Sequence, residues 1–136
     1  MEVLDLIRKN FVKLTPYSSA RDEYSGKEGV FLDANENPFG SVTGEALNRY
    51  PDPYQWACKE KLAHIKGVKP EQIFLGNGSD EAIDHLIRIT CRPKEDNILV
   101  LPPTYGMYRV CADIQEVGVQ EAPLTEDFDI DLDAVF

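Results

Sequence analysis

The sequence is poor in positive charge. Its 14 Lys and Arg residues stand against 24 Asp and Glu residues, so the formal net charge is −10 at pH 7. Nucleic-acid binding needs a basic patch, and anionic membranes attract polybasic segments, so we expect neither partner. No apolar run approaches the ~18 residues of a membrane span. The first residues, MEVLDLIRKNF, mix charged with apolar side chains and do not form a signal peptide. A cytoplasmic protein is therefore expected.

Cysteine is also scarce. Cys58, Cys91 and Cys111 form no C-x-x-C motif and are odd in number, which indicates reduced, mostly buried thiols. His64 and His85 show no metal-ligand spacing, so we assign no metal site. A catalytic thiol would need one of these histidines nearby in space, and it is disfavoured.

The 136 residues, 43% of them hydrophobic, suffice for one domain with a modest core. From residue 72 onward, predicted strands alternate with predicted helices, which argues for an α/β domain with a largely parallel sheet. The strands are QIFLGNGS (72–79), NILVLPP (97–103) and EVGVQEAPL (116–124), and the helices are SDEAIDHLIRITC (79–91) and TYGMYRVCADIQ (104–115). NILVLPP is almost continuously apolar, which is typical of a strand buried on both faces.

Upstream of residue 72, VLDLIRKNF (3–11) has helical spacing and predicts a short amphipathic arm, and VFLDA (30–34) predicts a short strand. The next helix is expected to begin at RYPDP, with Asp52 as its N-cap and Pro53 in its first position, and to end at Gly67. Near the end of the chain, Asp131 is a candidate N-cap for one more helix.

The stretch GNGSDEAID (76–84) places two glycines, a serine and two acids where a strand meets a helix. Free N–H groups at a helix N-terminus bind phosphate, and glycines let the anion approach closely. We expect Gly78 to give that access, Ser79 to add a hydroxyl, and Asp80 to face the ligand through its amide rather than its carboxylate, which favours the helix dipole. A capped helix without a ligand is the alternative. Walker and G-x-G-x-x-G patterns are absent from the stretch, which disfavours a nucleotide binder.

Other turns carry candidate side chains. PPTYG (102–106) ends a predicted strand, and ligands of parallel α/β sheets bind at such carboxyl ends. Tyr105 could stack there on a planar cofactor or could simply pack on neighbouring helices. DANENP (33–38) gathers amides and carboxylates, which are also common in turns whose side chains bond the backbone.

Together, LTPYSSAR, LDANENPFG, RYPDP, GNGSDEAIDHLIR and PPTYGMY occur in an order that resembles the N-terminal part of histidinol-phosphate aminotransferases, from about residue 10 to residue 136. These are fold-type I enzymes that use pyridoxal 5′-phosphate (PLP). The resemblance implies a helical arm over residues 1–28, a small-domain segment over 29–52 and the start of the PLP-binding large α/β/α domain over 53–136, with an incomplete sheet.

The resemblance also implies roles for individual residues. Ser79 and the amides of Gly78 to Asp80 would hold the PLP phosphate, and Tyr105 would stack on the pyridine ring. Two further side chains would serve a homodimer: Tyr50 would reach the cofactor phosphate of the other subunit, and Tyr17 would line the neighbouring subunit's substrate pocket. Asn35, in the loop after the first predicted strand, would lie near the substrate. The implied reaction transfers an amino group from glutamate, which becomes 2-oxoglutarate, to imidazole-acetol phosphate, which becomes histidinol phosphate.

The chain departs from this family in one large respect. Family members need a Schiff-base lysine, an aspartate for the pyridinium nitrogen and an arginine for the substrate carboxylate, and all three lie beyond the residue at which this chain stops. We therefore assign no catalytic residue and expect an inactive N-terminal fragment of a longer enzyme. Two alternatives stay open: a related PLP enzyme such as a threonine-phosphate decarboxylase, and a non-catalytic interaction module.

Overall fold

A computed structural model describes residues 2–18, 29–32, 34–45 and 47–136. The chain divides into two compact units. Unit 1 comprises Met1–Leu14 and Gly76–Phe136, and unit 2 comprises Thr15–Leu75. These units do not test the predicted domain boundaries, which stay a prediction.

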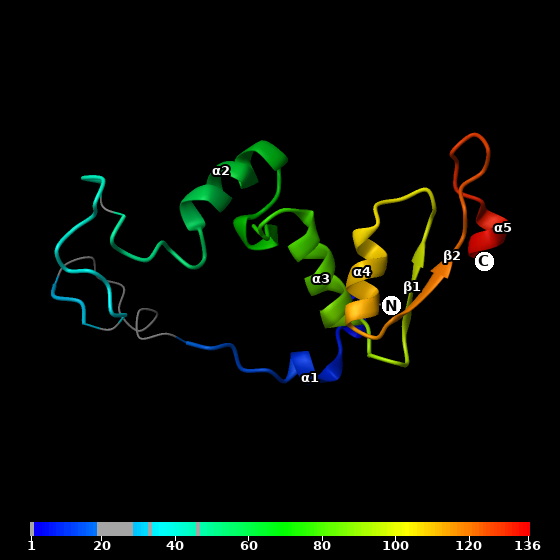
Figure 1. The fold of residues 1–136 in the computed structure, drawn as a ribbon, viewed down its shortest axis with the longest axis horizontal. Helices are drawn as coiled ribbons and strands as arrows, with labels where there is room; N and C mark the ends of the chain where they lie inside the picture. Colours follow the sequence, from blue (N-terminus) through cyan, green and yellow to red (C-terminus); the bar gives the residue numbers. More distant parts are fainter. Residues whose placement is uncertain (1, 19–28, 33, 46) are drawn as a thin grey trace. The chain divides into compact units, whose positions relative to one another are not determined.

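Unit 1 is built on two parallel strands, β1 (Asn97–Val100) and β2 (Gly118–Glu121). The chain passes from β1 to β2 through helix α4 (Met107–Ile114), which packs against both strands and against helix α3 (Ser79–Thr90) (Figure 1). A short helix, α5 (Leu132–Val135), follows β2 along the chain. Asp131 accepts hydrogen bonds from the Asp133 and Ala134 amides, which confirms it as the N-cap of α5. The predicted α/β arrangement is thus present with a partial sheet.

The core of unit 1 lies where α3 and α4 meet the strands. It is formed by Ile87, Cys111, Ala112 and Val117, with Ile83 and Ile98 among the residues packed around it. The apolar residues of α3 are only partly buried, because Leu86 remains 63% exposed. Leu99 of β1 is 42% exposed, so one face of this apolar strand is uncovered in the described chain. Successive side chains of a strand point to opposite faces, and Ile98 and Val100 occupy the covered one.

The spacing of the N-terminal arm predicted one helix, and this prediction was wrong. The arm forms a 3₁₀ turn, η1 (Val3–Leu6), and a short helix, α1 (Lys9–Val12), separated by an extended backbone at Ile7. Arg8 explains the break, because its backbone N–H donates to the Ile89 carbonyl over 3.0 Å and its guanidinium donates to the Arg88 carbonyl over 2.8 Å. These contacts satisfy the last carbonyls of α3 with a cation, which the helix dipole favours.

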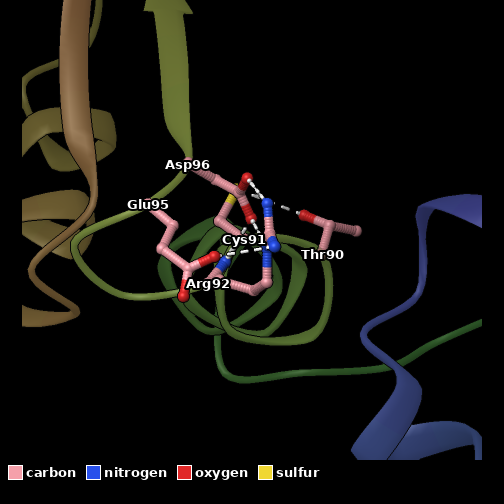
Figure 2. Close-up of polar contacts among 5 residues, drawn as sticks. All are labelled: Thr90, Cys91, Arg92, Glu95 and Asp96. Atoms are coloured by element: carbon pink, nitrogen blue, oxygen red, sulfur yellow. Dashed lines mark hydrogen bonds and ion pairs between the residues drawn. The ribbon is translucent and has the colours of Figure 1, made fainter.

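An ion-paired turn joins α3 to β1 (Figure 2). The Arg92 guanidinium makes a two-pronged contact with Asp96, with N···O distances of 2.9 and 2.7 Å, and pairs with Glu95 at 2.7 Å. The Arg92 backbone N–H also donates to Asp96 over 2.6 Å. This guanidinium is the main reason that the pKa of Asp96 is lowered to about 2. The turn thus fixes the point at which β1 begins.

The described residues of unit 2 include a regular helix, α2 (Trp56–Lys66), and a 3₁₀ turn, η2 (Pro70–Gln72). Gly67 ends α2 in the left-handed conformation (φ 67°), as predicted. Its start was misplaced, because Gln55 rather than Asp52 is the N-cap residue. Asp52 instead folds the preceding turn, with its carboxylate accepting from the Tyr54 and Trp56 amides over 2.9 and 2.8 Å.

Two predicted strands are absent from the described residues. The segment 72–75 forms part of η2 and then runs extended without β pairing, with Ile73 at φ −110° and ψ 123°. Of VFLDA, residues 30–32 and 34 are not in a strand, and Asp33 lies outside the described residues. A β-prone segment becomes a strand only where a neighbour supplies backbone partners, and β1 pairs with β2 instead.

The cysteines are free, as expected, but only Cys111 is buried, and Cys58 is exposed. None of the helices in the described ranges is long and apolar enough to cross a membrane.

Candidate functional site

The candidate site begins at the first turn of α3. Gly78 is the N-cap residue, with φ 81° and ψ −178°, a conformation that is essentially restricted to glycine. A methyl group added to Gly78 would meet no atom within 4 Å, so the space over the turn is open. Ser79 follows as an exposed residue in the first helical position. The glycine turn therefore presents the start of a 12-residue helix to open space.

Hydrogen-bond donors of this turn are unengaged. Within the described part of the chain, no group accepts a hydrogen bond from the Ser79 or Asp80 backbone N–H, and the Ser79 hydroxyl has no hydrogen-bond partner. The first N–H groups of a helix carry its partial positive charge. Two amides and one hydroxyl are thus available to an anion.

The two acids of the turn are engaged with other groups. Asp80 accepts a hydrogen bond from the Tyr105 hydroxyl, with an O···O distance of 2.9 Å. Glu81 accepts from the Asn77 backbone N–H over 2.5 Å. Both carboxylates are therefore bonded to groups of the protein, while the amides beside them have no such partner.

Tyr105 lies in the turn between β1 and α4. Its side chain is 53% exposed, and its ring meets that of Tyr108 edge-on, with centroids 6.4 Å apart and planes at 86°. The hydrogen bond to Asp80, followed by burial and the charges of Asp80 and Cys111, raises the pKa of Tyr105 above its ordinary 10.0. The phenol is therefore neutral near pH 7 and donates to the carboxylate.

A phosphate fits this donor set. Two unengaged amides and a hydroxyl converge at a helix N-terminus that glycine leaves open, which is the arrangement that binds phosphate in proteins. The half-exposed ring of Tyr105 adds a flat apolar surface beside that turn. Arg109, on the next helix, forms an ion pair with Glu121. Backbone dipoles and a hydroxyl, rather than that cation, are the groups offered to an anion here.

A second cluster lies in unit 2, around Glu36. Its side chain is only 2% exposed, and it binds the Arg49 guanidinium at 2.8 Å and the Tyr50 backbone N–H at 2.7 Å. Asn48 donates to the Asn37 carbonyl over 2.8 Å. The turn that follows VFLDA is thereby fastened to the RYPDP segment.

The Glu36 cluster brings two of the predicted site residues together. Asn35 and Tyr50 line one pocket of about 360 Å³, and Tyr17 is not part of its lining. Asn35 has a positive φ of 51°, and Tyr50 is 70% exposed. Tyr17 is 89% exposed, and Ser19, Ala20 and Arg21 of its motif lie outside the described residues. The predicted roles of these residues stay predictions.

Sequence reasoning missed Glu36 and Arg49 as supports of the site. Both lie in motifs that were singled out for other residues, and a pair of opposite charges 13 residues apart is too common to predict a contact. It also missed the bond between Asp80 and Tyr105, although it proposed both residues.

Comparison with known proteins shows similarity over nearly the whole chain. The family model described as "Aminotransferase class I and II" matches residues 25–135. The chain is 58% identical over 130 residues to the histidinol-phosphate aminotransferase of Cytophaga hutchinsonii, a match that covers 96% of this chain and 37% of that protein. It is 52% identical over 134 residues to that of Parabacteroides distasonis, covering 98% of this chain and 38% of that protein.

A solved structure supports the same fold. A protein from Erwinia carotovora atroseptica, provisionally named as a histidinol-phosphate aminotransferase, superposes with a TM-score of 0.54 at 28% identity, covering 75% of this chain and 32% of that one. This chain spans a little over a third of the length of the two curated relatives described above, 37% and 38%.

Proposed function

This chain belongs to the class I and II aminotransferase family, and we propose that it is the N-terminal part of a histidinol-phosphate aminotransferase, called here the whole protein. The whole protein would transfer an amino group from glutamate to imidazole-acetol phosphate. The names of both curated relatives favour this reaction over the decarboxylase alternative. The same names disfavour a purely non-catalytic module.

The observation that carries the proposal is the open donor set at the start of α3. Its Ser79 and Asp80 amides and the Ser79 hydroxyl have no partner among the described residues, and they match the phosphate of PLP, the cofactor of this family. Because the carboxylates of Asp80 and Glu81 are bonded to Tyr105 and Asn77, the acids of the turn are compatible with a bound phosphate.

The roles proposed for individual residues are those that the family resemblance implies. Ser79 and the neighbouring amides hold the phosphate, and Tyr105 orients the ring. Tyr50 serves the cofactor phosphate of the other subunit, and Tyr17 and Asn35 serve the substrate. PLP, when bound, supplies the electron sink for amino transfer. No proton-transfer role is assigned to a residue of this chain, whose proposed roles are to bind and orient.

Two further features belong to the proposal. Tyr17 and Tyr50, 89% and 70% exposed, are free to meet a second subunit, so we propose a homodimer with shared sites. The cytoplasm is the proposed location, because the three cysteines are free, as is usual in a reducing compartment.

The test compares the whole protein with the 136-residue chain, both supplied with PLP, glutamate and imidazole-acetol phosphate. We expect the whole protein to form histidinol phosphate and the chain alone to give no turnover, since no lysine of the family's context is present in it. Turnover by the chain alone would contradict the assignment of no catalytic residue. A whole protein that binds PLP but decarboxylates a phosphorylated amino acid would favour the decarboxylase alternative.

A further inference from the structure

The hydroxyl of Tyr105 and the carboxylate of Asp80 join two elements that are distant in sequence. Tyr105 lies in the turn after β1, and Asp80 is the second residue of α3. The hydroxyl donates to Oδ1 of Asp80 over 2.9 Å, across 25 residues of sequence. The bond therefore links the turn that carries the ring to the turn that carries the free amides.

We infer that Asp80 is a positioning residue for Tyr105: its carboxylate holds the phenol hydroxyl and so sets the ring against the amides of Ser79 and Asp80. The inference rests on the proposed function, because the ligand served by both groups is PLP. It goes beyond that function by assigning a task to the side chain of Asp80, which the sequence offered only as a source of an amide.

The ring would otherwise be weakly held. Its side chain is 53% exposed, and its one ring–ring contact among the described residues is the edge-on meeting with Tyr108. If a half-exposed tyrosine must stop rotating when a ligand binds, the lost conformational freedom lowers the affinity. A tyrosine that is already fixed avoids this cost. The bond to Asp80 fixes the far end of the ring and leaves much of its surface uncovered for stacking.

The carboxylate of Asp80 is not needed to cap α3. No side chain caps the first amides of the helix, while Glu81 accepts from the Asn77 amide over 2.5 Å and supplies a favourable charge to the helix dipole. No backbone N–H donates to the Asp80 carboxylate among the described residues, and Tyr105 is its hydrogen-bond partner. Glu81 therefore has a local structural role, whereas the carboxylate of Asp80 serves the hydrogen bond to Tyr105.

The bond also leaves a mark on the titration of the phenol. Asp80 is the largest cause of the raised pKa of Tyr105, through the hydrogen bond and its charge, and burial and Cys111 add to it. Cys111 is buried, which raises the pKa of its own thiol. Removing the Asp80 carboxylate should therefore lower the pKa of Tyr105 in protein that holds no cofactor.

The test uses four variants of the whole protein: Asp80→Ala, Asp80→Asn, Tyr105→Phe and the double variant Asp80→Ala/Tyr105→Phe. Asp84→Asn, one turn further along α3 where the carboxylate pairs with Arg88, controls for loss of a charge. PLP affinity is measured by absorbance titration. The phenol pKa is measured by ultraviolet titration of the cofactor-free protein, with Tyr105→Phe subtracted to isolate Tyr105.

We expect Asp80→Ala and Tyr105→Phe each to weaken PLP binding about three- to tenfold, the value of one hydrogen bond. The double variant should be no weaker than either single variant, because both remove the same bond. Asp80→Asn keeps an acceptor oxygen and the amide, so it should bind PLP nearly as wild type does while its Tyr105 pKa falls. Asp84→Asn should leave both quantities close to wild type.

An unchanged PLP affinity in Asp80→Ala, or single effects that multiply in the double variant, would overturn the inference. So would a phenol pKa that is the same in Asp80→Ala and in wild type. These results are distinct from failure of the proposed function, in which wild type itself would not bind PLP and the positioning role would fall with it.

Discussion

The two clusters that carry the predicted site residues are built in opposite ways. At the start of α3 the carboxylates of Asp80 and Glu81 are bonded to Tyr105 and Asn77, while the Ser79 and Asp80 amides and the Ser79 hydroxyl have no partner among the described residues. Around Glu36 the carboxylate is 2% exposed and bonded to both Arg49 and the Tyr50 amide. The first cluster leaves donors open to a ligand, and the second closes its polar groups on one another.

The contrast separates a binding surface from a support. Unengaged N–H groups are tolerated where water or a ligand can reach them, whereas a buried carboxylate must be paired. Substitutions at the first cluster should therefore change ligand affinity with little loss of stability. Substitutions at the second should reduce stability, and affinity only as a consequence. Substitutions in the two clusters therefore test whether one cluster binds a ligand while the other supports the fold.

The largest effect is expected for Glu36→Ala in the whole protein. It removes the acceptor of both the Arg49 guanidinium and the Tyr50 amide, and we expect a loss of about 2–3 kcal/mol of stability, reduced from the full cost of a buried pair because Arg49 is 40% exposed. Glu36→Gln should lose less, because it keeps an acceptor for the Tyr50 amide. Denaturant unfolding and hydrogen exchange over residues 34–51 measure the change.

Glu45→Gln is the matched control, because Glu45 is an exposed glutamate of the same segment. It should leave both measurements unchanged. If Glu36→Ala instead weakened PLP binding with no change in hydrogen exchange, the Glu36 cluster would contact the ligand itself. The distinction between a binding cluster and a supporting cluster would then be wrong.

The second effect is on binding. Ser79→Ala in the whole protein should weaken PLP binding about ten- to a hundredfold, because a hydrogen bond to a charged phosphate contributes about 1.5–3 kcal/mol. Asp80→Asn should change it much less, since its amide survives. Thermal unfolding of the cofactor-free Ser79→Ala protein should match wild type, because the hydroxyl has no partner in the described chain. A greater loss of affinity in Asp80→Asn than in Ser79→Ala would refute the account based on backbone amides.

The smallest effect is expected at the exposed carboxylate of Asp52 and the half-buried carboxylate of Asp96, which order turns in the two units. The pKa of Asp52 in unit 2 is lowered mainly by the Trp56 and Tyr54 amides, and that of Asp96 in unit 1 is lowered to about 2, mainly by Arg92. Because both values lie below the ordinary 3.8, each group stabilises the fold above that pH and loses its contribution as the pH falls through the folded-state value.

The measurement is the unfolding free energy against pH, from pH 5 to the acid limit. Asp52→Asn and Asp96→Asn should each lose less stability than wild type over this range, and the difference at Asp96 should persist toward pH 2. Added salt should shrink the Asp96 difference, because exposed ion pairs are screened. Wild-type acid sensitivity in Asp96→Asn would mean that the Arg92 contact adds nothing to stability.

Local chemistry made much of the fold predictable. Gly67 ends α2, Asp131 caps α5, and the helices α3 and α4 and the strands β1 and β2 lie within their predicted segments. Each of these signals acts within a few residues, through backbone conformation or capping. Asp52 was predicted to be the N-cap of α2, but it lies before the start of that helix, where its carboxylate closes a turn. Aspartate is favoured in turns as well as at helix N-caps, so the residue type alone does not decide between them.

Contacts between distant segments were not predictable. QIFL has the composition of a strand, yet its pairing depends on a neighbour that the sequence pattern does not identify. Arg8 divided the predicted arm helix because the carbonyls of Arg88 and Ile89 were there to be bonded. Leu86 and Leu99 have the character of core residues, and only packing decided that they remain exposed.

By itself, the sequence determined which groups the α3 turn offers, because a glycine, a hydroxyl and the amides of a helix start are neighbours along the chain. Only the tertiary structure decided how the charges of the two clusters are used. Asp80 reaches Tyr105 across 25 residues and Glu36 reaches Arg49 across 13. Local preferences do not extend over such separations. The pairs form because packing brings the segments together, and the cost of an unpaired buried charge then selects the partners.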